Sequence, residues 1–148
     1  MRVSSKGEYA IRAMLDLALQ YEKGLIPIQE VASRQGIPQR YLEQVLLLLK
    51  RAGFLTSKRG SAGGYHLSKP PKEITVGAVL SAIEGSLERP EVGRRGPRGT
   101  TVDHAGDLER LWMKVSEAVS GVVNGITFED LRQQVEARRS AARPMYYI

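Results

Sequence analysis

The chain has 148 residues, of which 42% are hydrophobic, and its formal net charge is +6 at pH 7. This length fits one compact domain, or one domain with an appended arm, and it suffices for a real hydrophobic core. No apolar run approaches the ~18 residues that a membrane span needs, and the N-terminus lacks the apolar segment of a secretory signal, so we expect a cytoplasmic protein without a membrane partner.

The sequence contains no cysteine and only two histidines, His66 and His104. The lack of cysteine excludes disulfides, thiolate zinc sites, cysteine-ligated Fe–S clusters and thiol redox sensing. The sequence also lacks a metal-ligating constellation and a phosphate-binding Gly-Lys-Ser/Thr loop. An enzyme is therefore the least favoured class, and we predict no catalytic residue, no metal site and no cofactor.

The positive charge is unevenly placed along the chain. Residues 1–75 carry 12 Lys and Arg against 6 Asp and Glu, whereas residues 76–148 carry 10 of each kind. The whole excess therefore lies in the N-terminal half. Such asymmetry fits a solvated basic surface as well as the electrostatic footprint of a nucleic-acid binder, and charge alone does not separate the two.

A capping box marks the start of the first predicted helix, because Ser5 precedes Glu8 by three residues. Apolar residues then recur at helical spacing, which predicts a helix from about Lys6 to Tyr21 that ends near Gly24. Lys6 lies at the helix start, where it either contacts a phosphate or is an ordinary surface cation.

Residues 28–68 have the order of a helix-turn-helix followed by a wing. A short helix is predicted over 29–34, Gly36 permits a tight turn, and Pro38 suits the first turn of a second helix over 38–52. Four residues of that second helix form its predicted buried stripe: Leu42, Val45, Leu46 and Leu49.

The polar side chains of the second helix lie largely on its other faces. Gln and Arg near the start of such a helix suit base edges in the major groove, because each can make bidentate contacts there. The residues on these other faces are Gln39, Arg40, Glu43, Gln44 and Leu47. The alternative is an ordinary amphipathic helix with a polar outer face.

A Gly-rich basic hairpin follows, with strands predicted over 54–57 and 65–68. Its tip, residues 58–64, contains three glycines and two cations and includes Lys58, Arg59, Gly60 and Ser61. Such a tip can lie in a minor groove with an inserted arginine, although many Gly-rich hairpin tips are inert. Because this one follows a helix-turn-helix, we favour contact with DNA through Arg59.

Three regions are predicted along the chain. A winged helix-turn-helix domain spans residues 1–85 and ends with a fourth helix over 74–84, with Thr75 as its N-cap. A flexible loop of 86–104, rich in Pro, Gly and Arg, either contacts DNA or a partner or is merely solvated, and the solvated state is the favoured one. Residues 105–148 hold a long helix, a last helix and a tail over 141–148.

The long helix is predicted over residues 107–124 and would measure about 25–30 Å. Its broad apolar stripe needs another surface, most economically the same helix of a second chain, although packing within its own chain is the alternative. The predicted dimer interface comprises Leu108, Leu111, Trp112, Val115, Val119, Val122 and Val123. A last helix, capped by residues 127–130, is predicted to reach about residue 139.

Five stretches, taken in order, resemble the Rrf-two family of winged-helix bacterial transcription regulators, the IscR-, NsrR- and CymR-like proteins. They are MRVSSKGEYAIRAMLDL (1–17), YLEQ (41–44), RGSAGGY (59–65), ITVGAVLSAIEG (74–85) and GITFEDL (125–131). The resemblance implies a mainly α fold with a small β-hairpin wing and a long dimerisation helix. It also implies a homodimer that binds a palindromic operator, most often as a repressor.

The resemblance also implies roles for individual residues. Tyr41, Glu43 and Gln44 belong to the YLEQ stretch, and the last two would face base edges. Arg59 would enter a minor groove, and three residues of the first helix would lie near the DNA backbone: Ser5, Lys6 and Tyr9.

The chain departs from the family pattern in two ways. Pro38 and Arg40 replace small polar residues that many relatives use in the recognition helix, so the operator sequence is expected to differ. Fe–S-binding relatives place three cysteines in the loop before the long helix, and this loop has none. Glu8 and Glu109 stand where relatives have non-cysteine ligands, but without thiolates they cannot hold a cluster, so we predict a cluster-free member.

The leading hypothesis is thus a homodimeric, sequence-specific transcription regulator, most often a repressor in such families, whose partner is double-stranded DNA. The alternative is a protein-interaction module on a winged-helix scaffold that is regulated by a partner enzyme or a small effector. The two are compatible, because a cluster-free regulator needs another input, such as an effector protein or a small molecule.

Overall fold

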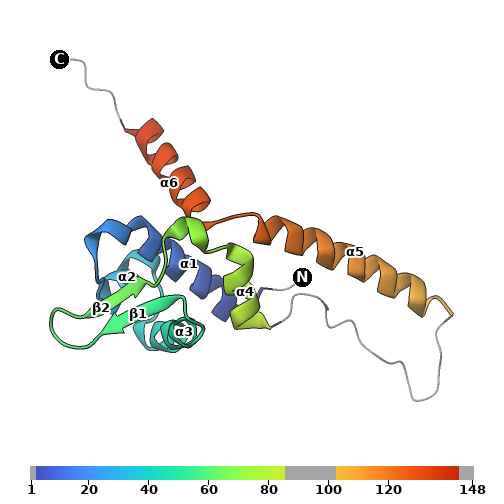
Figure 1. Cartoon of the computed structure of the whole chain (residues 1–148), viewed down its shortest axis with the longest axis horizontal. Helices are drawn as coiled ribbons and strands as arrows, with labels where there is room; N and C mark the ends of the chain where they lie inside the picture. The colour runs from blue at the N-terminus through green and yellow to red at the C-terminus, as the bar shows by residue number, and fades with distance from the viewer. Residues whose placement is uncertain (1–2, 86–102, 144–148) are drawn as a thin grey trace.

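The computed structural model describes residues 3–85 and 103–143. In Figure 1, helices α1 to α4 and a β-hairpin form the body, and helices α5 and α6 extend away from it. The mainly helical fold with a hairpin wing is the one that the sequence predicts. The elements are α1 (Ser5–Leu19), η1 (Tyr21–Lys23), α2 (Ile28–Gln35), α3 (Gln39–Arg51), β1 (Leu55–Lys58), β2 (Gly64–Leu67), η2 (Pro71–Glu73), α4 (Val76–Glu84), α5 (Ala105–Asn124) and α6 (Phe128–Ala142).

Two predicted segments fall largely outside the described residues. These are the predicted loop of 86–104, of which only 103 and 104 are described, and the end of the tail, 144–148. The other predicted helix bounds agree with the structure to within about three residues. Within the described ranges, no helix has both the length and the apolar character needed to cross a membrane.

Helix α1 is the centre of the hydrophobic core. It packs against α2, α3, α4 and α6, and its inward side carries small alanines beside larger side chains, so that several helices can approach it closely. Phe128, the first residue of α6, is fully buried in the same core. The core residues of α1 are Ala10, Ala13, Met14, Leu17 and Ala18, all at most 1% exposed.

The turn between α2 and α3 depends on Gly36. This glycine has φ 61°, a left-handed conformation that costs glycine little. The following amide, of Ile37, donates to the carbonyl of Ala32 at 3.1 Å, which closes the C-terminal end of α2. Ile37 is then 3% exposed in the core, so the turn sets the position from which α3 starts.

A buried carboxylate fixes α2 against α1. Asp16 is 1% exposed, and Arg34 donates to its two oxygens at 2.9 and 3.0 Å. Gln35 adds a third hydrogen bond at 3.2 Å. The hydrogen bond to Asp16 raises the pKa of Arg34. A buried carboxylate needs such partners, so this contact sets the angle between α1 and the first helix of the helix-turn-helix.

The wing is an antiparallel pair in which Leu55 lies opposite Leu67 and Lys58 opposite Gly64. A third backbone segment, which the sequence analysis did not predict, joins it. Ile26 and Tyr65 exchange two hydrogen bonds of 2.9 and 2.8 Å. A two-stranded hairpin alone is marginally stable in water, so this attachment holds the wing to the body.

The predicted capping box of α1 is wrong by one residue. The N-cap is Ser4, whose hydroxyl accepts from the amide of Gly7 at 3.1 Å, and Ser5 is the first helical residue. Ser4 is further held by Glu84 at the end of α4, which accepts from its amide at 2.9 Å and from its hydroxyl. Adjacent serines look equally suitable in the sequence, and the contact with α4 decides between them.

This correction predicts different effects for two neighbouring substitutions. Ser4→Ala should lower the free energy of unfolding by about 1 kcal/mol, the usual loss for an N-cap serine. Ser5→Ala should change it by less than about 0.5 kcal/mol, as for an exposed site without such a contact. Urea denaturation of both variants, followed by circular dichroism, measures the difference. Equal losses of unfolding free energy in the two variants would contradict the assignment of Ser4 as the N-cap.

The start of α4 and the start of α6 are joined by backbone hydrogen bonds. Val76 donates to Ile126 at 2.8 Å, and Phe128 donates to Ile74 at 3.0 Å. As predicted, Thr75 caps α4, and residues 127–130 cap α6, here with a complete capping box. The base of α5 is therefore fixed to the winged body, while its other end extends away from the body (Figure 1).

Candidate nucleic-acid interface

Helix α3 has one fully buried side and one exposed side. The buried side carries the four predicted residues 42, 45, 46 and 49, each 0% exposed. At 100° per residue, the remaining positions fall on the opposite side. The predicted base-reading residues all lie there and are all exposed: Gln39, Arg40, Glu43 and Gln44.

Leu47 also lies on this exposed side and was not among the predicted DNA-binding residues. It is 45% exposed and follows Glu43 by four residues and Gln44 by three, which places it beside both on the helix surface. An apolar side chain among polar ones suits the methyl group of a thymine. Its phase places it outside the buried stripe in the sequence as well, so an apolar side chain at an exposed helix position is the signal that could have identified it as a candidate.

Tyr9 and Tyr41 contact each other, edge to face, with ring centroids 5.3 Å apart. The guanidinium of Arg12 lies over the Tyr9 ring at 5.5 Å and donates to the carbonyl of Gln35 at the end of α2. Both tyrosines are half-buried against the core. This cluster joins α1, α2 and the first turn of α3, so its first effect is to position α3.

The tip of the wing is compact and exposed. Gly60 has φ 111° and accepts from the amide of Gly63 at 3.0 Å. A Cβ at Gly63 would collide with the backbone of Lys58. The side chains of Lys58, Arg59 and Ser61 are exposed around this turn.

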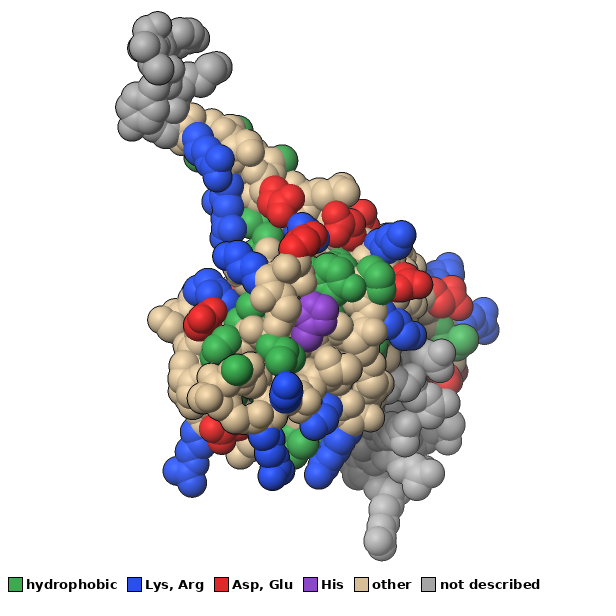
Figure 2. All heavy atoms as spheres, turned by 60° about the vertical axis from the view of Figure 1, so that its left-hand side comes forward, with side chains coloured by type: hydrophobic (Ala, Val, Ile, Leu, Met, Phe, Trp, Pro, Cys, Tyr) green, Lys and Arg blue, Asp and Glu red, His purple; other side chains and the backbone are tan. Residues whose placement is uncertain are grey.

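Basic side chains gather on the side of the molecule that carries α3 and the wing. Figure 2 shows Lys and Arg side chains along the lower edge of this face and a second series along α6. Strand β1 packs against α3, so the exposed side of α3 and the wing belong to one continuous surface. Ser5 and Lys6 are exposed in the first turn of α1. They take no part in the Tyr9–Tyr41 contact, which lies one turn later.

The apolar stripe of α5 is divided between two environments. Helix α5 packs against α4 of its own chain, and four of the predicted interface residues are half-buried: Trp112, Val115, Val119 and Val123. The other three are exposed: Leu108 by 42%, Leu111 by 50% and Val122 by 61%. The alternative of packing within the chain thus accounts for one side of the stripe and leaves the other side uncovered.

The donor atoms of this chain do not fit an Fe–S cluster. The sequence has no cysteine, and within the described residues no three His, Asp or Glu side chains gather as metal ligands would. Glu8 is exposed and lies 4.0 Å from Arg12, and Glu109 is exposed on α5.

Comparison with known proteins identifies the family. The family model Rrf2, described as "Iron-dependent Transcriptional regulator", matches residues 3–134. The chain is 39% identical to the HTH-type transcriptional regulator IscR of Serratia proteamaculans over 164 residues, which cover 100% of this chain and 96% of that protein. It is 41% identical to IscR of Klebsiella pneumoniae over 134 residues, covering 88% and 79% of the two chains.

Two solved structures resemble the whole fold. CymR, the global cysteine regulator of B. subtilis, superposes with a TM-score of 0.78 at 30% identity, covering 90% of this chain and 98% of that one. IscR of T. potens gives a TM-score of 0.75 at 30% identity, with 99% and 95% covered. The family and these relatives are transcriptional regulators, not enzymes, and this chain belongs to the Rrf2 family of winged-helix transcription regulators.

Proposed function

We propose that this chain forms a homodimer that binds a palindromic operator and represses transcription. The observation that carries the proposal is the exposed side of α3, which presents polar side chains from residue 39 to residue 44 beside an exposed basic wing. An α-helix fits the major groove, and a hairpin tip with an arginine fits a minor groove. The protein would act in the cytoplasm, where a bacterial chromosome lies.

In this proposal, α3 reads bases in the major groove. Arg40 offers two donors, which suit a guanine edge, and Gln39 and Gln44 each offer one donor and one acceptor, which suit an adenine edge. Glu43 accepts from the amino group of a cytosine. Leu47 contacts a thymine methyl. Tyr41 holds the first turn of α3 through its contact with Tyr9, which lies near the DNA backbone in this proposal.

The wing and the start of α1 position the protein on the sugar–phosphate backbone. Arg59 inserts into a minor groove, where a narrow A·T-rich segment has an enhanced negative potential. Lys58 and Ser61, with the compact turn at Gly60, lie against the flanking phosphates. Ser5 and Lys6 contact a phosphate from the start of α1, where the helix dipole favours an anion.

The dimer forms through the uncovered side of the α5 stripe, which includes Leu108, Leu111 and Val122. Two copies of one helix related by a two-fold axis bury the same residues on both chains. Two winged bodies related by that axis address two half-sites of opposite orientation, so the operator is palindromic. The half-buried side of the stripe keeps α5 attached to its own body.

Regulation in this proposal does not use a cluster, because the chain has no thiolate ligand. The input is an effector protein or a small molecule that changes operator affinity. Protein bound to an operator that overlaps a promoter then blocks RNA polymerase. Iron chelation and iron addition should both leave operator binding of the purified protein unchanged.

Footprinting and gel shift on the promoter of the protein's own gene test the proposal. We expect protection of an inverted repeat by a dimer. The affinity should fall as the salt concentration rises, because binding releases cations condensed on the DNA phosphates and their release becomes less favourable at high salt. Run-off transcription from that promoter should decrease when protein is added. If no inverted repeat is protected at moderate salt, the operator proposal is wrong. A gel shift that changes when an iron chelator is added would refute the proposal that regulation works without a cluster.

A further inference from the structure

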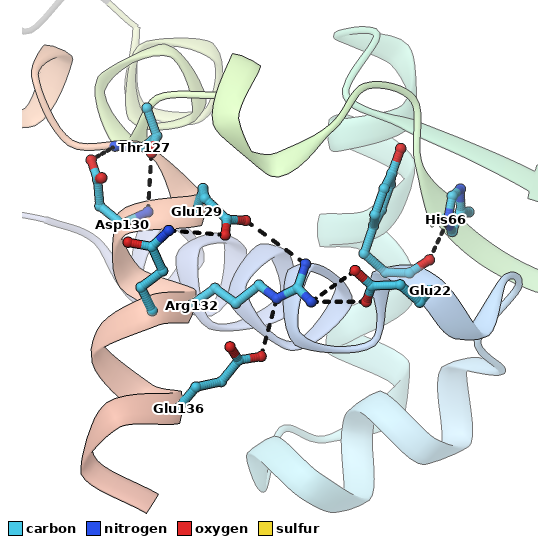
Figure 3. Close-up of polar contacts among 9 residues, drawn as sticks. Glu22, His66, Thr127, Glu129, Asp130, Arg132 and Glu136 are labelled. Carbon is cyan, nitrogen blue, oxygen red and sulfur yellow. Dashed lines mark hydrogen bonds and ion pairs between the residues drawn. The ribbon is translucent and has the colours of Figure 1, made fainter. Parts of the chain in front are cut away.

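A chain of side-chain contacts links the wing to α6 through the short helix η1. Figure 3 shows its members: His66 on β2, Glu22 in η1, and Arg132 on α6. These residues are distant in sequence, and no sequence motif links them. We name the set formed by Tyr21, Glu22, His66 and Arg132 the η1 bridge.

The first link joins the wing to η1. The ring of His66 stacks on the ring of Tyr21, with centroids 4.8 Å apart and planes 14° from parallel. The Nε2 atom of His66 lies 2.9 Å from the carbonyl oxygen of Tyr21. A carbonyl oxygen only accepts, so Nε2 carries the hydrogen and donates it. Ring packing and one hydrogen bond therefore hold the middle of β2 against η1.

The second link joins η1 to α6. Arg132 donates from Nη2 to both carboxylate oxygens of Glu22, at 2.8 and 2.9 Å. Its side chain is only 17% exposed, and Glu136 and Glu129 lie at 3.2 and 3.8 Å on the same helix. The hydrogen bond from Arg132 lowers the pKa of Glu22. Three carboxylates thus hold one guanidinium in a fixed direction.

The wing also packs on the body through β1 against α3 and through β2 against α1. Its backbone pairs with Ile26, which follows η1 by three residues, so the described hydrogen bonds that join β2 to the body go to the segment 21–26. A displacement of η1 would shift His66 and Ile26 together and would reorient the tip that carries Arg59. The opposite side of η1 is held by Arg132.

We propose that the η1 bridge positions the wing for the minor groove, with Arg132 and His66 as positioning residues that never touch DNA. This inference rests on the proposed DNA binding and adds a specificity-determining contact to it. Arg132 would set how well Arg59 reaches the groove. Within the described residues, no hydrogen bond or ion pair joins Arg59 to Arg132, so coupling between their substitutions does not come from direct contact, and the His66 variant tests whether it passes through the bridge.

A double-mutant cycle tests the proposal. Operator affinity is measured for the wild type, Arg59→Ala, Arg132→Gln and the double variant, and again with His66→Phe, which keeps the ring stack and removes the hydrogen bond. Substitutions that do not interact add within a factor of about two. We expect Arg59→Ala to lose at least about threefold less affinity in either bridge variant than in the wild type. Additive effects would overturn the proposal.

Hydrogen exchange provides a readout that needs no DNA. Arg132→Gln should speed exchange of the Ile26 and Tyr65 amides, which bond to each other, by at least about fivefold, with thermal unfolding showing that the variant is folded. Arg139→Gln is the matched control, since this exposed arginine of α6 forms no ion pair among the described residues. Unchanged exchange in Arg132→Gln would also overturn the bridge.

The two readouts separate this inference from the function on which it rests. If Arg59→Ala leaves operator affinity unchanged in the wild-type background, the proposed role of the wing is wrong, and the exchange rates still decide whether the bridge holds β2. If Arg59→Ala weakens binding but the cycle is additive, DNA binding stands and the positioning role of Arg132 is wrong.

Discussion

Arg59→Ala should weaken operator binding by about tenfold to a hundredfold, which is within the ~1–3 kcal/mol expected for a side chain in a groove. Arg59 is exposed at a turn whose backbone is fixed by Gly60 and Gly63, so its position does not depend on the DNA. The loss should be greatest when the operator is A·T-rich where the wing lies, since a narrow minor groove concentrates negative potential. Fluorescence anisotropy on labelled operator gives the affinities.

Two controls separate groove insertion from general charge. Arg59→Lys keeps the charge but replaces a planar guanidinium that is weakly hydrated, so it should restore only part of the affinity. Arg139→Ala removes a cation from α6, away from the wing, and should change affinity by less than about twofold. Replacing the A·T pairs under the wing by G·C should reduce the operator affinity of the wild type by a larger factor than it reduces the affinity of the Arg59→Ala variant. Equal losses for both proteins would show that Arg59 contacts only phosphates.

The sequence predicted which side of α3 is exposed, the side that we propose reads DNA, because exposure here follows from local patterns. Helical phase separated the buried stripe of α3 from Gln39, Arg40, Glu43 and Gln44, and all four are exposed. Glycine and cation content predicted the turn of the wing. Helical phase also placed Leu47 outside the buried stripe, but Leu47 was not predicted to contact DNA, because only its polar neighbours offer hydrogen bonds to base edges.

The attachments of these elements could not be predicted, since they join residues far apart in the chain. Tyr21 and His66 are separated by 45 positions, and Glu22 and Arg132 by 110. Charged and aromatic residues on short elements have many potential partners, and the fold alone selects among them. The choice of Ser4 over Ser5 as the N-cap has the same cause, because Glu84 on α4 supports Ser4.

The uncovered side of α5 is the proposed dimer interface. Leu111→Glu should convert the dimer to a monomer at micromolar concentration, measured by analytical ultracentrifugation. Leu111 is 50% exposed in the single chain, so the new carboxylate stays hydrated in the monomer, and circular dichroism should show an unchanged helix content. In a dimer, two such carboxylates would be buried near the two-fold axis without partners, which is strongly unfavourable.

Loss of the dimer should also make binding to the two half-sites independent. A dimer binds its second half-site at a high effective concentration, which raises the overall affinity by about a hundredfold to ten-thousandfold. Leu111→Glu should therefore bind a full operator scarcely better than a single half-site, whereas the wild type strongly prefers the full operator. Arg110→Glu, which places the same carboxylate on the exposed polar side of α5, should remain dimeric and keep that preference. Leu111 lies between Leu108 and Val122 in the exposed apolar strip of α5, so a dimer through this strip would bury the new carboxylate. A Leu111→Glu variant that sediments as a dimer would therefore show that the chains associate elsewhere.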